Sequence, residues 1–180
     1  LSTMNPCSTG TGCAAPEAPA LDPAEGTCTG VNLSWSQGTG DTASYNVYRK
    51  VAPCGGTYAK IAGPLVATTY SDLSAVAGTS YAYVERGACD VAGATESPDS
   101  NCMTAARLVS PAPTISGDAS NTCPSTTVTL TTQSGKGSYQ WYLGGSPISG
   151  ANAYQPAAAS TGTYTVSYTE ANGCSGTSAG

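Results

Sequence analysis

Short runs in which apolar and polar residues alternate recur along most of the chain. Val31, Leu33 and Trp35 alternate with Asn32 and Ser34, which places the three apolar side chains on one face of a strand. The same two-residue period returns near residues 45–49, 81–84, 128–130, 139–141 and 164–166. No stretch keeps the apolar spacing of a helix over three turns. The pattern predicts an all-β protein.

The strand-like runs fall into two sets separated by a proline-rich stretch. Residues 109–113 read Val-Ser-Pro-Ala-Pro, and two prolines this close together favour an extended, semi-rigid connection. Residues 1–17 contain no alternating run. We therefore predict an extended leader over residues 1–17, a first domain over 18–109 and a second domain over 110–180.

Composition narrows the chemistry that this chain can perform. It has 180 residues, no His and no Phe, only 9% charged residues and a formal net charge of −5. Without His there is no Ser-His-Asp triad, Cys-His dyad or His-ligated zinc site. The six Lys and Arg residues are not clustered, which argues against a nucleic-acid surface. No segment approaches the length of a membrane-spanning helix, which needs about 20 apolar residues.

The cysteines indicate an oxidising compartment. Aliphatic residues are scarce, and 22 Gly with 12 Pro point to many turns, so the apolar core is thin. An even number of cysteines with no C-x-x-C pair favours disulfides over a metal site. The sequence therefore predicts a secreted β protein whose disulfides involve Cys7, Cys13, Cys28, Cys54, Cys89, Cys102, Cys123 and Cys174.

The first segment resembles a fibronectin type III domain. The residues that carry the resemblance are VNLSW with Trp35, YNVYR with Tyr45 and Val47, and GTSYAYV with Tyr81. The resemblance implies that Trp35 lies in the core and that Tyr81 ties its strand to the preceding loop.

The second segment is similar to a bacterial immunoglobulin-like domain. Its signature is YQWYLGGSPISGA followed by GTYTVSYTEANGCS, and the likeness implies that Trp141 is the core tryptophan and Tyr164 a tyrosine corner. Leu130 and Val166 occupy the positions of that family's inter-sheet cysteines. Little chain follows GCS, so we expect a short last strand. Either the segment is simply short, or residues 1–17 of another chain cover its edge.

The sandwich interpretation also implies a disulfide pairing. It places Cys7 with Cys13, Cys28 with Cys54, Cys89 with Cys102 and Cys123 with Cys174, and a link from the first pair to another chain remains an alternative. Small domains with thin cores depend on such bridges for stability.

The remaining chemistry is sparse. The eleven carboxylates scatter across loops, and neither a phosphate-binding glycine loop nor a calcium loop is present. Tyr48, Tyr142 and Tyr154 are candidates for outward-facing aromatics on which a sugar would stack. We predict no catalytic residue, no metal ligand and no cofactor.

These observations favour a non-catalytic extracellular protein with a structural or adhesive role at the bacterial cell surface. One form of this hypothesis is the repeating subunit of a surface filament, joined by strand exchange between chains. The alternative is an accessory C-terminal module of a secreted bacterial protease or glycosidase. In this alternative the module is a candidate for carbohydrate binding. The expected partners are other proteins, including copies of this chain, and polysaccharide, without nucleic acid or a membrane span.

Overall fold

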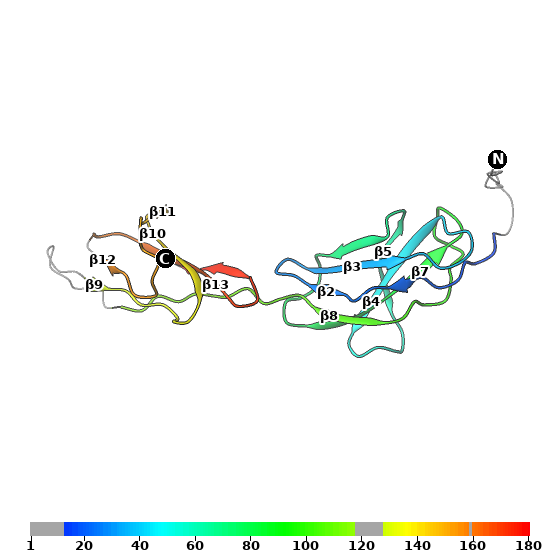
Figure 1. Cartoon of the computed structure of the whole chain (residues 1–180), viewed down its shortest axis with the longest axis horizontal. Coiled ribbons are helices and arrows are strands. Elements are labelled where there is room, and N and C mark those ends of the chain that lie inside the picture. The colour runs from blue at the N-terminus through cyan, green and yellow to red at the C-terminus, as the bar shows by residue number, and fades with distance from the viewer. Residues whose placement is uncertain (1–12, 118–127, 159) are drawn as a thin grey trace. The chain divides into compact units, whose positions relative to one another are not determined.

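A computed structural model describes residues 13–117, 128–158 and 160–180 (Figure 1). The chain divides into two compact units, Leu1–Arg107 and Leu108–Gly180. Every regular element in the described ranges is a β-strand, which confirms the all-β prediction. None of the described residues forms a helix with the length and apolar character needed to cross a membrane.

The first unit contains two antiparallel sheets. In one sheet the central strand pairs with the three others, and its strands are β3 (Val31–Ser36), β1 (Ala20–Leu21), β2 (Glu25–Gly26) and β6 (Thr69–Asp72). The second sheet has the order β5 (Ala59–Leu65), β4 (Ser44–Val51), β7 (Ser80–Ala88) and β8 (Met103–Ala106). The two sheets enclose one apolar core.

Alternation along β3 determines which side chains enter this core. Val31, Leu33 and Trp35 are buried, whereas the residues between them face outward or are only partly covered. The Trp35 ring meets the Tyr45 ring edge-on at 5.5 Å between centroids. Tyr83 is also fully buried, so aromatic rings supply much of the bulk that the scarce aliphatic residues do not.

The connection between β7 and β8 runs back alongside β7. The Ser97 amide donates to the Gly87 carbonyl at 2.7 Å, and the Ser100 amide donates to the Glu85 carbonyl at 2.9 Å. The hydroxyls of these two serines accept hydrogen bonds from the Gly87 and Glu85 amides, each at 3.0 Å. Residues 96–101 therefore lie along β7 from Glu85 to Gly87, and β8 pairs with β7 from Ser80 to Tyr83.

This path shows that the predicted pairing of Cys89 with Cys102 was wrong. Met103 pairs with Tyr83, so Cys102 lies at the level of Val84, five residues from Cys89 along β7. Five extended residues span about 17 Å, and a disulfide needs Cα atoms within about 7 Å. The structure instead joins Cys13 to Cys89 and Cys54 to Cys102, with Cα separations of 5.8 and 6.1 Å.

These two bonds also contradict two other predicted pairs. Cys13 is not bonded to Cys7, and Cys54 is not bonded to Cys28. Cys28 and Cys174 each take part in a disulfide bond. Cys7 and Cys123 lie outside the described residues. The predicted Cys123–Cys174 bridge therefore also falls outside them.

The described end of the predicted leader, residues 13–17, is attached to the first unit. Cys13 is bonded to Cys89, Pro16 is buried, and the Glu17 amide donates to the Thr39 carbonyl at 2.9 Å. Residues 13–17, which fall within the predicted leader, thus contact the first unit.

The second unit is smaller and also all-β. One sheet has the order β11 (Ser146–Pro147), β10 (Gly137–Leu143), β13 (Tyr164–Thr169) and β14 (Ser175–Thr177). A second, two-stranded sheet pairs β9 (Val128–Thr129) with β12 (Ala157–Ala158). Leu130, Trp141 and Val166 form the buried core. The Trp141 indole nitrogen donates to the Ala153 carbonyl at 2.8 Å, so the N–H of this buried ring is satisfied.

The last strand is short, and its pairing with β13 continues for one residue beyond β14. Beyond β14, the Ser178 amide donates to the Val166 carbonyl at 2.9 Å, and the Ser178 hydroxyl accepts from the Val166 amide at 3.0 Å. The Pro111 carbonyl lies so close to Gly176 of β14 that no Cβ would fit there, and because a strand's Cβ atoms point to the sheet faces, Pro111 packs over a face of β14.

Candidate functional site

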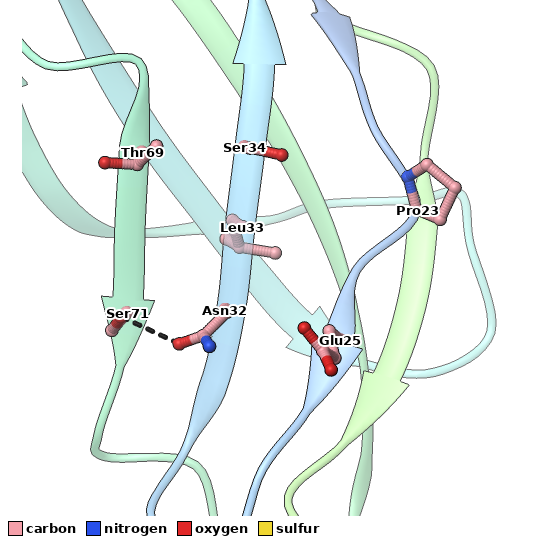
Figure 2. Close-up of a pocket in the computed structure, with 7 residues that line it drawn as sticks. All are labelled: Pro23, Glu25, Asn32, Leu33, Ser34, Thr69 and Ser71. Atoms are coloured by element: carbon pink, nitrogen blue, oxygen red, sulfur yellow. Dashed lines mark hydrogen bonds between the residues drawn. The ribbon is translucent and has the colours of Figure 1, made fainter.

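A polar groove lies on the outer face of the sheet formed by β2, β3 and β6 (Figure 2). Its volume is about 310 Å³. The lining residues come from these three strands and from the chain between β1 and β2, and they are Pro23, Glu25, Asn32, Leu33, Ser34, Thr69 and Ser71. Because side chains alternate along β3, the same pattern that buries Leu33 turns its two polar neighbours outward.

Strand pairing arranges the polar groups in two rows across the sheet. In the first row Asn32 of β3 stands between its register partners Glu25 and Ser71. In the second row Ser34 stands opposite Thr69. Side chains paired directly across antiparallel strands have Cβ atoms about 5 Å apart, so each row presents neighbouring polar groups on a rigid support.

Hydrogen bonds orient two of these side chains. The Ser71 hydroxyl donates to Asn32 Oδ1 at 2.8 Å, and Figure 2 shows the Asn32 amide nitrogen turned toward the Glu25 side of the row. The Ser34 hydroxyl donates to Asp22 Oδ2 at 2.8 Å. Among the described residues, no partner hydrogen-bonds the Asn32 amide nitrogen, the Glu25 carboxylate or the Thr69 hydroxyl. The groove therefore offers a fixed donor, a carboxylate acceptor and hydroxyls to a ligand.

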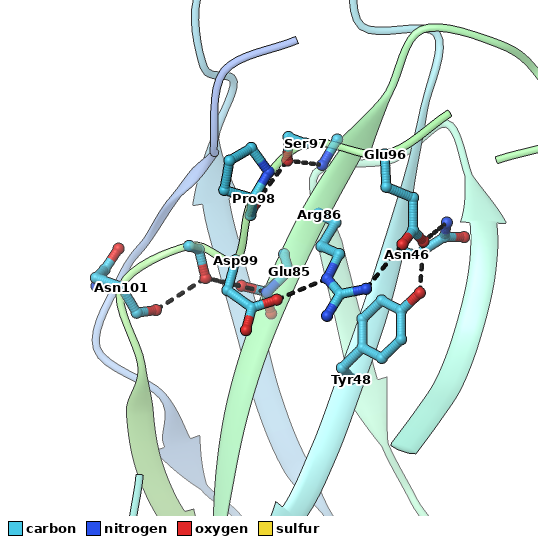
Figure 3. Close-up of polar contacts among 11 residues, drawn as sticks. Asn46, Tyr48, Glu85, Arg86, Glu96, Ser97, Pro98, Asp99 and Asn101 are labelled. Atoms are coloured by element: carbon cyan, nitrogen blue, oxygen red, sulfur yellow. Dashed lines mark hydrogen bonds and ion pairs between the residues drawn. The ribbon is translucent and has the colours of Figure 1, made fainter. Parts of the chain in front are cut away.

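A second polar cluster surrounds Arg86 on the other sheet (Figure 3). The guanidinium donates to Asp99 Oδ1 at 2.6 Å and to Glu96 Oε2 at 2.9 Å, and it lies 4.2 Å from the centre of the Tyr48 ring. Glu96 also accepts hydrogen bonds from the Tyr48 hydroxyl and from Asn46. Burial, reinforced by Glu96, raises the pKa of Tyr48 to about 12. This cluster holds residues 96–99 against β4 and β7, and every member is engaged within it.

A third cluster joins the two sheets through Asp72, whose side chain is fully buried. Its carboxylate accepts hydrogen bonds from Arg49 at 2.6 Å, Tyr83 at 2.9 Å and the Ser74 hydroxyl at 2.7 Å. Burial acts to raise the pKa of Asp72, but these donors and the charge of Arg49 outweigh it and lower the pKa. No local sequence pattern predicts this cluster, because Asp72 belongs to one sheet and Arg49 and Tyr83 belong to the other, and only the packing of the two sheets brings them together.

Glu85 on β7 is buried without a cation beside it. The Ser100 hydroxyl lies 3.3 Å from Glu85 Oε2, and Glu85 Oε1 has no hydrogen-bond partner. Burial raises the pKa of Glu85 to about 8, and the Ser100 hydroxyl opposes this shift only in part. The carboxyl group is therefore protonated at neutral pH.

The four aromatic residues expected in the cores are placed as follows. Trp35, Tyr81 and Trp141 are buried, and Tyr164 is partly buried against the core of the second unit. The Tyr164 hydroxyl donates to the Ser160 carbonyl at 2.8 Å, which is the geometry of a tyrosine corner. Tyr81 makes a different contact, with Arg49 located 4.4 Å from its ring centre.

The aromatics considered for sugar stacking do not form one platform. Arg86 covers the Tyr48 ring in the first unit, whereas Tyr142 and Tyr154 belong to the second unit. Tyr142 is partly buried on β10, and Tyr154 is 40% exposed. Hydrogen-bonding groups rather than these rings make the groove of Figure 2, and the sequence gives little signal for it beyond the outward positions of β3.

One group of side chains in the described ranges has the spacing of metal ligands, namely Cys13, Cys89 and Asp90. The two cysteines are bonded to each other, which removes their thiolates. The Asp90 carboxylate accepts hydrogen bonds from the Ala94 and Thr95 amides at 3.0 and 2.8 Å. These residues therefore stabilise a loop and do not form a metal centre.

Comparison with known families identifies the second unit. Residues 111–179 match the family model described as Ig-like domain CHU_C associated. The second unit is an Ig-like domain. This confirms the resemblance derived from Trp141, Tyr164 and the residues around them. No curated protein sequence matches the chain.

Several solved structures are similar to parts of the chain. A β-1,2-glucanase from Parabacteroides distasonis has 23% identity over 54% of this chain and 13% of its own, with a TM-score of 0.46. An Fn3-like protein from Clostridium thermocellum has 29% identity over 51% of this chain and 92% of its own, with a TM-score of 0.41. A segment of two fibronectin type III domains from chicken tenascin has 17% identity over 89% of this chain and 98% of its own, with a TM-score of 0.46. The chain thus spans only a small part of the glucanase.

Proposed function

We propose that this chain is a non-catalytic extracellular protein with a structural or adhesive role. The observation that carries the proposal is that all six cysteines in the described ranges are disulfide-bonded. Such bonds form and persist in oxidising compartments and are rare in the cytosol. The two bonds within the first unit hold both ends of the β7–β8 connection, so the disulfides stabilise the sandwich itself.

The compartment is tested in the organism that makes the protein. Intact cells are treated with a protease that does not cross membranes, and the chain is detected with a specific antibody alongside a cytosolic marker protein. We expect the chain to be cleaved or to be found in the medium while the marker stays intact. Full protection together with free thiols in the isolated protein would overturn the proposal.

The finer form of the proposal is a filament subunit that donates residues 1–17 to a neighbouring chain. Low surface charge supports it, because with 9% charged residues little repulsion opposes close packing of copies. The attachment of residues 13–17 to their own unit restricts the donated segment to residues 1–12. Negative-stain images of the purified chain and of a variant lacking residues 1–12 test this form. Filaments that persist in the truncated variant would overturn strand donation.

The alternative role is an accessory module of a secreted hydrolase that holds a polysaccharide near a catalytic domain. The groove on β2, β3 and β6 favours it, because hydroxyl, amide and carboxylate groups are oriented there toward solvent. The coding sequence tests this alternative, since a catalytic domain upstream in the same reading frame is expected. A reading frame that encodes only this chain behind a secretion signal would overturn it.

A further inference from the structure

We propose that the groove on the outer face of β2, β3 and β6 binds one or two rings of a neutral saccharide. The inference rests on the proposed extracellular role, and it adds the site and the class of ligand. The groove has a volume of about 310 Å³, which is at the small end of ligand pockets, since these span about 300–1,000 Å³. The groove therefore suits a short stretch of a sugar chain.

The donors and acceptors of the groove match the chemistry of a polyol. A sugar hydroxyl donates one hydrogen bond and accepts others, so it pairs best with a surface that offers both kinds of group. The Asn32 amide nitrogen is a donor, the Glu25 carboxylate is an acceptor, and the Thr69 hydroxyl is both. None of the three is hydrogen-bonded to another described residue.

The site is organised before any ligand arrives. The Ser71 hydroxyl fixes the orientation of the Asn32 amide, and the Ser34 hydroxyl is held by Asp22. Asn32, Ser34 and Ser71 stand on paired strands, so binding orders few groups and costs little conformational entropy. At one end of the groove the Pro23 ring supplies an apolar surface for the C–H face of a sugar (Figure 2).

The charge of the groove selects among saccharides. Glu25 is the only charged residue that lines it, and the Asp22 carboxylate is adjacent through Ser34. Two carboxylates and no lining Lys or Arg disfavour sulfated sugars and uronic acids, because like charges repel and no cation compensates. The expected ligand is therefore an uncharged hexose or pentose polymer.

The test is an amide chemical-shift titration of the full, oxidised, ¹⁵N-labelled chain. The probes are cellohexaose, xylohexaose and mannohexaose, with oligogalacturonate and a lysine-rich peptide in parallel. We expect at least one neutral probe to shift the amides of residues 31–34 and 69–71 saturably, with a dissociation constant on the order of 1 mM. Oligogalacturonate is expected to cause no such shifts.

A double variant, Asn32→Ala with Thr69→Ala, is expected to weaken binding at least tenfold. The matched control is Thr104→Ala, which removes an exposed hydroxyl from β8 in the opposite sheet. The inference is overturned if no neutral probe shifts these amides, if the double variant binds as the wild type does, or if only the lysine-rich peptide responds. Protease accessibility on intact cells is measured separately. A surface-exposed chain that binds no sugar would overturn this inference alone, and a cytosolic chain would overturn the proposed function.

Discussion

Two buried carboxylates in the first unit show how neighbouring groups decide the state of an acid. Asp72 has Arg49 and three hydroxyl or amide donors around it and stays ionised, with its pKa lowered. Glu85 is equally buried, has one hydroxyl neighbour and no cation, and its pKa is raised to about 8. Burial alone would neutralise both groups, so the difference comes from their partners.

The raised pKa of Glu85 gives a prediction with a definite sign. Between about pH 4.5 and about pH 8 the unfolded chain has released this proton and the folded chain has kept it. Glu85 therefore lowers the free energy of unfolding by up to about 1.4 kcal/mol per pH unit across that range, and the loss levels off above it. Glu85→Gln keeps a neutral side chain of the same shape. We expect the variant to be more stable than the wild type at pH 7 and nearly equal to it at pH 4.

Urea unfolding at a series of pH values measures this effect. The matched control is Asp41→Asn, which neutralises an exposed acid in the loop before β4. If Glu85→Gln and the wild type have parallel stability profiles between pH 5 and pH 8, the carboxyl group is not neutral in the folded chain and the prediction is wrong.

At the scale of single elements, β5 is held against β4 by a close backbone approach. Gly63 has a φ of +116°, and a Cβ at this position would lie 2.7 Å from the Tyr45 carbonyl and against the Asn46 amide oxygen. Both the left-handed backbone and the lack of space require glycine. We expect Gly63→Ala to lower the free energy of unfolding by at least about 2 kcal/mol, because strain and steric overlap act together.

Gly137→Ala is the matched control for Gly63→Ala. Its Cβ would have its nearest neighbour, the Thr169 carbonyl, at 3.6 Å, and its φ is not positive. Chemical denaturation of both variants measures the difference. Equal stability changes would show that β5 moves away from β4 at little cost, contrary to the prediction.

The sequence pattern locates individual strands, but it does not show which residues of different strands lie close together in the fold. Alternation located β3, β10 and β13 because each has one buried face, and a period of two is visible without tertiary contacts. The disulfide pairing depends on the path of residues 96–101 along β7, which no local pattern encodes. The groove has the same origin: Asn32 is one outward residue among many until pairing places Glu25 and Ser71 beside it.

The Cys54–Cys102 bond connects the β4–β5 loop to the start of β8. It closes a loop of 48 residues, and removing such a bond costs about 2–4 kcal/mol, chiefly because the unfolded chain gains freedom. We expect the double variant Cys54→Ala with Cys102→Ala to lose this amount of stability in the first unit. Trp35 reports on that unit and Trp141 on the other, so fluorescence of single-tryptophan versions, each with the other residue replaced by Phe, assigns the loss. A loss confined to the Trp141 signal would contradict the structure.

At the scale of the whole molecule, two cores of unequal size stabilise the two units. Among the described residues, nine buried side chains form the main core of the first unit and three form that of the second. Since buried apolar area supplies most of the favourable free energy of folding, the first unit has the larger source of stability. Within it, β4 and β7 pair along their entire length and each has a further neighbour on its other side.

Hydrogen exchange of the oxidised chain, read by mass spectrometry, compares the two units without any substitution. We expect the amides of β4 and β7 to exchange more slowly than those of β10 and β13, because opening the first unit exposes more apolar surface. Protection that falls in both units by the same factor with rising urea would indicate a single cooperative transition. Slower exchange in β10 and β13 than in β4 and β7 would contradict the prediction, and it would mean that core size does not determine the order in which the two units open.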